Sequence, residues 1–273
     1  MNRRFVLTLF IAALANAQTP EPTVERAFNR LYSFQFEESQ RVARAFSEKH
    51  PADPMGHATL AASYLFSEMN RLKVFNKDMF KEDKANNQQG KQIGEAAKRS
   101  FETALNQAKS TGEEALKKNA KDTNALLGLL IATGAERDFA ALVEKRYKDS
   151  YYAAKASQEY ALRLQAIDPS LGDAWFTRGF SEYLVGSVPF VIRWLMKIDQ
   201  VSGDKKKGVE LMEKCAQSGR YLKPFAQMML ASIDQKDKRL PETRKMLEAF
   251  AADHPDNVVI REELAKMSKS QGI

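Results

Sequence analysis

The sequence is poor in the residues that cross-link a chain, interrupt helices or bind metals. Its 273 residues include one cysteine, 9 prolines, 13 glycines and 3 histidines. A single thiol excludes an internal disulfide, so stability must come from packing. With so few helix-breaking residues and many Ala, Leu, Lys, Glu and Gln residues, the sequence predicts a largely helical chain. Hydrophobic residues make up 44% of the chain, which is enough to bury a sizeable core.

Signatures of catalytic and metal sites are also missing from the sequence. The histidines form no His-x-x-x-His pair, and the lone Cys215 has no second cysteine for a zinc or haem motif. There is no Gly-x-Ser-x-Gly elbow, no phosphate-binding glycine loop and no dinucleotide fingerprint. Adjacent carboxylates such as Glu37 and Glu38 point about 100° apart on a helix, which disfavours a shared acid–base site. We therefore predict a protein that is not an enzyme and that has no catalytic residues, no cofactor and no metal.

The N-terminus has the features of a secretory signal peptide. Two arginines precede an apolar run over residues 5–14, and residues 15–17 read Ala-Asn-Ala, a small-x-small cleavage site. We expect residues 1–17 to be removed and the mature chain, residues 18–273, to be periplasmic or secreted. The apolar run is about half the length that a membrane span needs, and an uncleaved anchor is the alternative. No later stretch reaches that length, so we expect no integral membrane span in the mature chain.

The charge distribution favours protein partners over nucleic acid. The formal net charge is +7, and without the two arginines of the signal peptide 40 basic residues face 35 acidic ones. These charges are interspersed, as on a solvated helix surface, apart from one cluster at Lys205–Lys207. An exported chain without a recognisable binding motif is not expected to bind nucleic acid. The basic balance leaves peripheral association with an anionic membrane surface open as an alternative.

Two distant segments of the chain are nearly alike. Residues 45–51 read Ala-Phe-Ser-Glu-Lys-His-Pro and residues 249–255 read Ala-Phe-Ala-Ala-Asp-His-Pro. Each reads as the end of an amphipathic helix, because the residue before a proline is disfavoured in the helical region. The register continues upstream, where Ser39 aligns with Thr243. Such self-similarity predicts a repeat architecture, in which the two segments mark the first and last helix pairs and their histidines do not form a paired site.

Two further segments share a pattern on one helical face. Residues 57–64 read His-x-x-Leu-Ala-x-x-Tyr, and residues 175–182 read Trp-x-x-Arg-Gly-x-x-Glu. They resemble the first helix of the tetratricopeptide repeat (TPR), which reads aromatic, two residues, Leu-Gly, two residues, Tyr. The resemblance covers most of residues 21–267 and implies an all-α fold, with stacked antiparallel helix pairs in a right-handed superhelical solenoid. A small residue allows the paired helices to touch in several repeats: Ala27, Ala61, Gly179 and Ala231.

The mature chain, predicted to be a single repeat domain, departs from a regular repeat in two places. A polar insertion occupies about residues 70–95, and an irregular apolar segment occupies about residues 186–203. We expect the helix before the insertion to continue to about Phe80. We also expect a long helical stretch over residues 139–166 to break near Asp149. After the apolar segment, Asp204 is a plausible N-cap for a helix that begins at about Lys205.

The resemblance implies a scaffold that mediates protein–protein interaction in the cell envelope through its concave groove. The first helix of each pair lines such a groove, and exposed Trp and Arg side chains dominate many interfaces. The alternative for the apolar segment is that residues 188–196 fold back and plug the groove. The candidate partner-binding residues are Phe176, Phe180, Tyr183, Phe190, Arg193 and Trp194.

A second reading of the sequence is a periplasmic small-molecule or lipid-binding protein associated with a transport system. The chain is similar in this respect to the periplasmic TPR partner of TRAP-type solute transporters, which is also helical and exported. In that reading, residues 188–196 close an apolar pocket.

Overall fold

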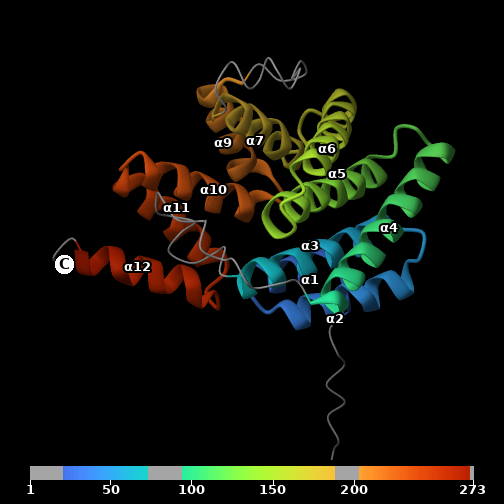
Figure 1. Cartoon of the computed structure of the whole chain (residues 1–273), viewed down its shortest axis with the longest axis horizontal. Coiled ribbons are helices and arrows are strands. Elements are labelled where there is room, and N and C mark those ends of the chain that lie inside the picture. Colours follow the sequence, from blue (N-terminus) through green and yellow to red (C-terminus); the bar gives the residue numbers. More distant parts are fainter. Residues whose placement is uncertain (1–20, 73–93, 188–202, 271–273) are drawn as a thin grey trace, which may run out of the picture.

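The computed structural model describes residues 21–72, 94–187 and 203–270, and every regular element in these ranges is helical. Neighbouring helices pack in pairs that follow one another around the centre of the view in Figure 1, so the predicted all-α fold of stacked helix pairs is confirmed. None of the helices in the described ranges is both long and apolar enough to cross a membrane. The pairs are α1 (Val24–Tyr32) with α2 (Phe36–Lys49), α3 (Pro54–Arg71) with α4 (Glu95–Lys118), α5 (Thr123–Asp138) with α6 (Tyr147–Ile167), α7 (Asp173–Ser187) with α9 (Lys205–Ser218), and α10 (Lys223–Lys236) with α11 (Leu240–Asp253), followed by α12 (Val258–Ser270).

Helix starts follow capping signals in the sequence. The Thr23 hydroxyl accepts a hydrogen bond from the backbone N–H of Arg26 at 3.1 Å. The carboxylate of Asp204 accepts one from the backbone N–H of Lys207 at 3.1 Å, so the predicted cap of α9 is confirmed. Each bond satisfies one of the donors that a helix N-terminus leaves free, which is worth about 1 kcal/mol.

The first and last helix pairs end in the same backbone conformation. His50 has φ −129° and ψ 62°, and His254 has φ −131° and ψ 64°. Their backbone N–H groups donate to the carbonyls of Phe46 and Phe250, both at 2.9 Å. The repeat equivalence predicted from the two His-Pro segments is therefore confirmed at the level of the backbone.

The contacts inside these two pairs are also equivalent. The Ser39 hydroxyl of α2 donates to the Ala27 carbonyl of α1 at 2.9 Å. The aligned Thr243 hydroxyl of α11 reaches the Ala231 carbonyl of α10 at 3.5 Å. Both alanines are fully buried. A larger side chain at either position would push apart the two helices that touch there.

Two helix boundaries differ from the sequence predictions. Helix α3 ends at Arg71, earlier than the expected Phe80, and most of the polar insertion lies outside the described residues. The expected break near Asp149 lies earlier in the chain. There α5 continues into a π-helical turn, Phe139–Val143, and α6 begins only at Tyr147. The buried side chains of the π-turn, Phe139 and Ala140, hold this segment against its neighbours. Helix propensity depends only on the local sequence and does not include this packing.

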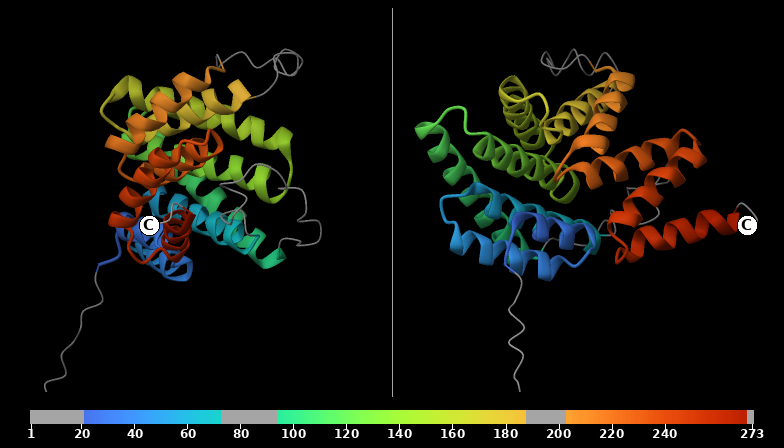
Figure 2. Two further views of the ribbon diagram at one scale, coloured as in Figure 1. Left: turned by 90° about the vertical axis from the view of Figure 1, so that its left-hand side faces the viewer. Right: turned by 180° about the vertical axis from the view of Figure 1, so that it is seen from behind.

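The array of helix pairs closes on itself, which the sequence did not predict. Viewed from two sides, α12 and α11 lie near the blue N-terminal helices (Figures 1 and 2). The Tyr32 hydroxyl of α1 donates to the Tyr221 carbonyl at 2.9 Å, and the Asn257 amide donates to the Tyr32 carbonyl at 2.8 Å. The ring of Tyr32 also lies 5.6 Å from that of His254. These contacts bring the last helix pair against the first helix.

Asn257 is expected to be a strong contributor to this closure. Its side-chain oxygen accepts the backbone N–H of Ile260 at 3.0 Å, and its amide holds the carbonyl of Tyr32. Asn257→Ala removes a cap and leaves a buried carbonyl without a partner, so the free energy of unfolding should fall by about 2 kcal/mol. Urea unfolding measures the change, and Asn119→Ala, at an exposed helix end, is the control. Equal losses in the two variants would contradict the role assigned to Asn257.

Candidate functional site

Three of the six predicted site residues lie on one face of α7. Phe176, Phe180 and Tyr183 follow the spacing of a single helical face. Burial decreases along this face: Phe176 is 2% exposed, Phe180 and Tyr183 are half-buried, and the next residue, Leu184, is 43% exposed. The face therefore leads from the centre of the molecule to its surface.

The other three predicted residues, Phe190, Arg193 and Trp194, lie outside the described residues. The suggested plug or pocket cover, residues 188–196, lies there too. The described chain resumes at Gly203, where the carboxylate of Glu182 of α7 accepts the backbone N–H of Gly203 at 2.8 Å and the ammonium of Lys207 at 3.0 Å. This carboxylate thus joins α7 to the start of α9.

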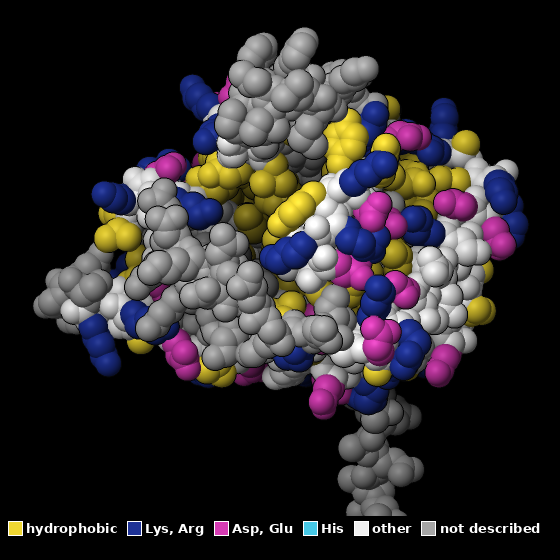
Figure 3. All heavy atoms as spheres, in the orientation of Figure 1, with side chains coloured by type: hydrophobic (Ala, Val, Ile, Leu, Met, Phe, Trp, Pro, Cys, Tyr) yellow, Lys and Arg dark blue, Asp and Glu magenta, His cyan; other side chains and the backbone are white. Residues whose placement is uncertain are grey.

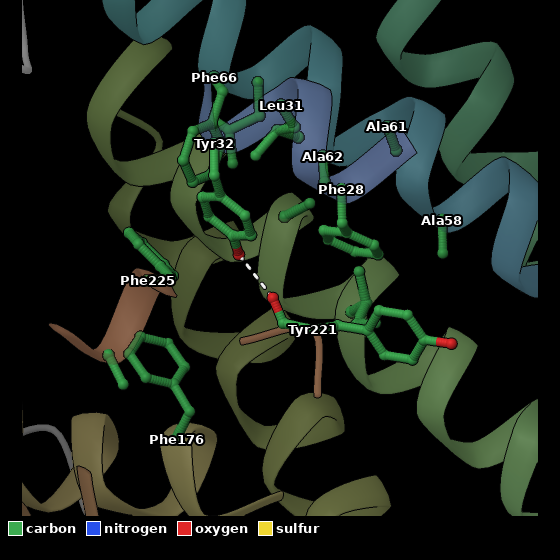
Figure 4. Packing of buried hydrophobic residues seen from close by; sticks show 14 of the residues in the cluster. Phe28, Leu31, Tyr32, Ala58, Ala61, Ala62, Phe66, Phe176, Tyr221 and Phe225 are labelled. Carbon is green, nitrogen blue, oxygen red and sulfur yellow. Dashed lines mark hydrogen bonds between the residues drawn. The ribbon is translucent and has the colours of Figure 1, made fainter. Parts of the chain in front are cut away.

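The predicted open groove is replaced at its centre by an aromatic cluster. Ring centroids lie 4.9 Å apart for Phe176 and Phe225, 5.3 Å for Phe225 and Phe66, and 5.8 Å for Phe66 and Tyr32. These rings come from α7, α10, α3 and α1 and face a common centre (Figure 4). Burying each such ring is worth about 1.5–3 kcal/mol, so closure is favoured over an open apolar groove.

A hollow remains beside this cluster. Its volume is about 40 Å³, and it is partly open to solvent. This volume is enough for roughly three waters. Its lining is almost entirely apolar, and Figure 3 shows hydrophobic side chains gathered in the hollowed centre of this face.

The charged residues that line the hollow are the pair Arg137 and Asp138, which we did not single out from the sequence. The guanidinium donates from Nε and Nη2 to the two carboxylate oxygens of Asp138, at 2.7 and 2.8 Å. Its Nη1 is buried and has no hydrogen-bond partner in the described part of the chain. The guanidinium carbon also lies 4.7 Å from the ring centroid of Phe180, a cation–π contact with a predicted site residue.

The position of this pair follows from the helix that carries it. Helix α5 is buried on nearly all sides, so charged residues at its C-terminus are carried into the interior. The π-turn then places Phe139 flat on Phe101 of α4, with ring centroids 3.9 Å apart. The sequence did offer a signal for this pair: three charged residues, Glu136, Arg137 and Asp138, end the long apolar stretch over residues 125–135.

The remaining titratable candidates are structural. His254 is buried against Phe250 and Tyr32, and burial lowers its pKa. Cys215 is buried between α9 and α7, and burial raises the pKa of its thiol well above the usual value. Within the described ranges, no three His, Cys, Asp or Glu residues gather in a way that could hold a metal ion.

Comparison with known proteins finds a distant likeness among solved structures. No protein-family model matches the chain, and no curated protein matches it either. Among solved structures, the chain is similar to TTC0263, a thermophilic TPR protein from Thermus thermophilus, with 13% sequence identity and a TM-score of 0.45. The likeness covers 89% of this chain and 96% of that one. A likeness this distant does not assign the chain to a family.

Proposed function

We propose that the protein is a non-enzymatic, exported TPR-like scaffold that binds a protein partner in the cell envelope. The observation that carries this proposal is the apolar face of α7, which rises from the buried core to the surface. Phe180, Tyr183 and Leu184 form its accessible end. Helix α7 is packed against α9 and held at both ends by buried carboxylates, so this end is a rigid anchor point for a partner.

The charges beside this face indicate the character of the partner. The ammonium of Lys205 lies 6.0 Å from the ring centroid of Tyr183, and Lys206 is exposed next to it. Lys207 pairs with Glu182, whereas no described side chain forms an ion pair with Lys205 or Lys206. The surface therefore suits a partner segment with an apolar anchor and acidic neighbours, which these two lysines would attract.

Site-directed crosslinking tests this function. A photoreactive phenylalanine analogue replaces Leu184 in the full exported chain, and a second version carries it at Tyr147, an exposed aromatic of α6. We expect position 184, and not position 147, to capture one defined envelope protein. Tyr183→Ala should weaken that capture in protein that remains folded. No capture at 184, or the same proteins from both positions, would overturn the proposal.

A second candidate function is small-molecule or lipid binding in the envelope, in association with a transport system. The observation that favours it is the hollow beside the aromatic cluster, with a buried donor of Arg137 that has no described partner. Ligand sites are typically apolar with few polar groups. Native mass spectrometry of freshly purified mature protein should show a co-purified small molecule, and a spectrum of unliganded protein alone would count against this function.

A further inference from the structure

A large groove lies among the helices of the first two pairs. Helices α2, α3 and α4 lie next to one another (Figure 1). Both α2 and α4 pack on α3 but do not pack closely against each other, and a groove of about 760 Å³ lies between them. We propose that this α2–α4 groove binds an extended segment of a protein partner and holds an acidic side chain of that segment between Arg44 and Arg99. None of the described residues that line it belongs to α7, so the site goes beyond the surface proposed above.

One face of each of the three helices lines the groove. The lining residues recur every three or four positions, which places them on the same side of a helix. Along α4 they run from Ala96 to Gln107, a distance of about 16 Å along the helix axis. This length accommodates about five residues of an extended chain, at about 3.3 Å per residue.

The openness and polarity of the groove favour an extended segment over other occupants. A small-molecule site usually encloses most of its ligand, whereas this groove is open to solvent. A docked helix needs an apolar stripe on its receptor, and the α4 wall instead presents Ser100, Thr103 and Gln107. Within the described ranges these three side chains form no hydrogen bond, so they are available to the backbone N–H and carbonyl groups of a bound segment.

Two arginines from opposite walls lie at one end of the groove. The guanidinium of Arg44 donates a hydrogen bond to the hydroxyl of Tyr64, and its carbon lies 5.9 Å from the centroid of that ring. Because α3 and α4 are antiparallel, the half of α3 that carries Tyr64 lies beside the first turns of α4, which carry Arg99. Both arginines are exposed, and neither forms an ion pair within the described part of the chain. Guanidinium groups bind carboxylates through charge-assisted hydrogen bonds, so this end suits an acidic side chain.

The other titratable residues of the groove limit the segment to one acidic residue. Glu48 lies one helical turn after Arg44, is exposed, and forms no ion pair in the described ranges. Its carboxylate would repel a second acidic residue nearby. His57, toward the other end, is half-buried, and burial lowers its pKa, so it adds no positive charge at neutral pH. We therefore expect one acidic residue among neutral or basic ones.

A phage-displayed library of random heptapeptides tests the site without knowledge of the partner. We expect selection on the mature chain to enrich sequences with a single aspartate or glutamate. An enriched peptide is then synthesised with acetylated and amidated ends, so that its side chain is the only carboxylate. Replacing the acidic residue by its amide should lower the affinity about tenfold, the effect of losing a charged hydrogen bond. Fluorescence polarisation measures both affinities.

Two variants place the peptide in the groove. Arg44→Gln combined with Arg99→Gln should remove the difference between the acidic peptide and its amide. Arg261→Gln combined with Lys269→Gln changes the net charge equally on exposed positions of α12 and should leave the difference intact. Thr103→Trp fills the groove at an exposed position without changing the charge, and it should abolish binding in protein that remains folded.

Tyr183→Ala separates this site from the α7 face, which also favours acidic segments, and it should not change the affinity. No enriched sequence, equal binding of acid and amide, or unchanged binding in both the arginine variant and Thr103→Trp would overturn the inference. Loss of binding in Tyr183→Ala alone would also overturn it and would assign the peptides to the α7 face. Photocrosslinking at position 184 tests that face independently, so either site can fail without the other.

Discussion

Gly179→Ala is expected to destabilise the protein by about 3 kcal/mol, because the added methyl group would meet the backbone of α9. A Cβ at this position would lie 2.7 Å from the carbonyl oxygen of Gly208 and 2.8 Å from the backbone nitrogen of Met212. The contact is mutual, since a Cβ on Gly208 would lie 2.6 Å from the backbone nitrogen of Tyr183. Backbone atoms cannot rotate away as a side chain does, so α7 and α9 must separate to make room.

The matched control for this variant is Gly134→Ala in the middle of α5. A Cβ there would have the hydroxyl oxygen of Ser157 as its nearest neighbour, at 3.8 Å, which is ordinary van der Waals contact. Alanine in a helix interior is favoured over glycine by about 0.5–1 kcal/mol, so this variant should be neutral or slightly more stable. Guanidinium unfolding followed by circular dichroism measures both. Similar stabilities for the two variants would show that α7 and α9 do not approach as closely as described.

Asp173→Ala is expected to cost about 4 kcal/mol, because one buried carboxylate holds three backbone donors. Its oxygens accept the N–H groups of Arg220, Tyr221 and Leu222 at 3.1, 2.8 and 2.6 Å, and the residue is 2% exposed. These donors belong to the turn between α9 and α10. The same turn presents the Tyr221 carbonyl that binds the Tyr32 hydroxyl, so its loss also weakens closure of the array.

Hydrogen exchange locates the effect of Asp173→Ala. The amides of residues 220–222 should lose protection before those in the middle of α5, because the carboxylate is their hydrogen-bond acceptor. Asp168→Ala serves as the control: among the described residues, the carboxylate of Asp168 accepts only the exposed hydrogen bonds from Ser170, so its removal should have a small effect. Unchanged protection of the turn in Asp173→Ala would contradict the assigned role.

The sequence by itself determined the local architecture of this protein. The start of α9 after Asp204, the His-Pro helix ends and the small residues Ala27 and Gly179 all follow from it, because caps, prolines and close helix contacts act within a helix or between neighbours in a pair. Phe176 could be placed on the inner face for the same reason, as helical spacing decides which side chains share a face.

Only the tertiary structure decided that the inner face is filled. Closure depends on small rotations that add up from pair to pair, and no local pattern reports their sum. The contacts that result join residues very distant in sequence, such as Tyr32 with Tyr221 and with Asn257. The same closure packs the end of α5 against aromatic rings, and it thereby buries Arg137, an ordinary charged residue in the sequence, beside an apolar hollow.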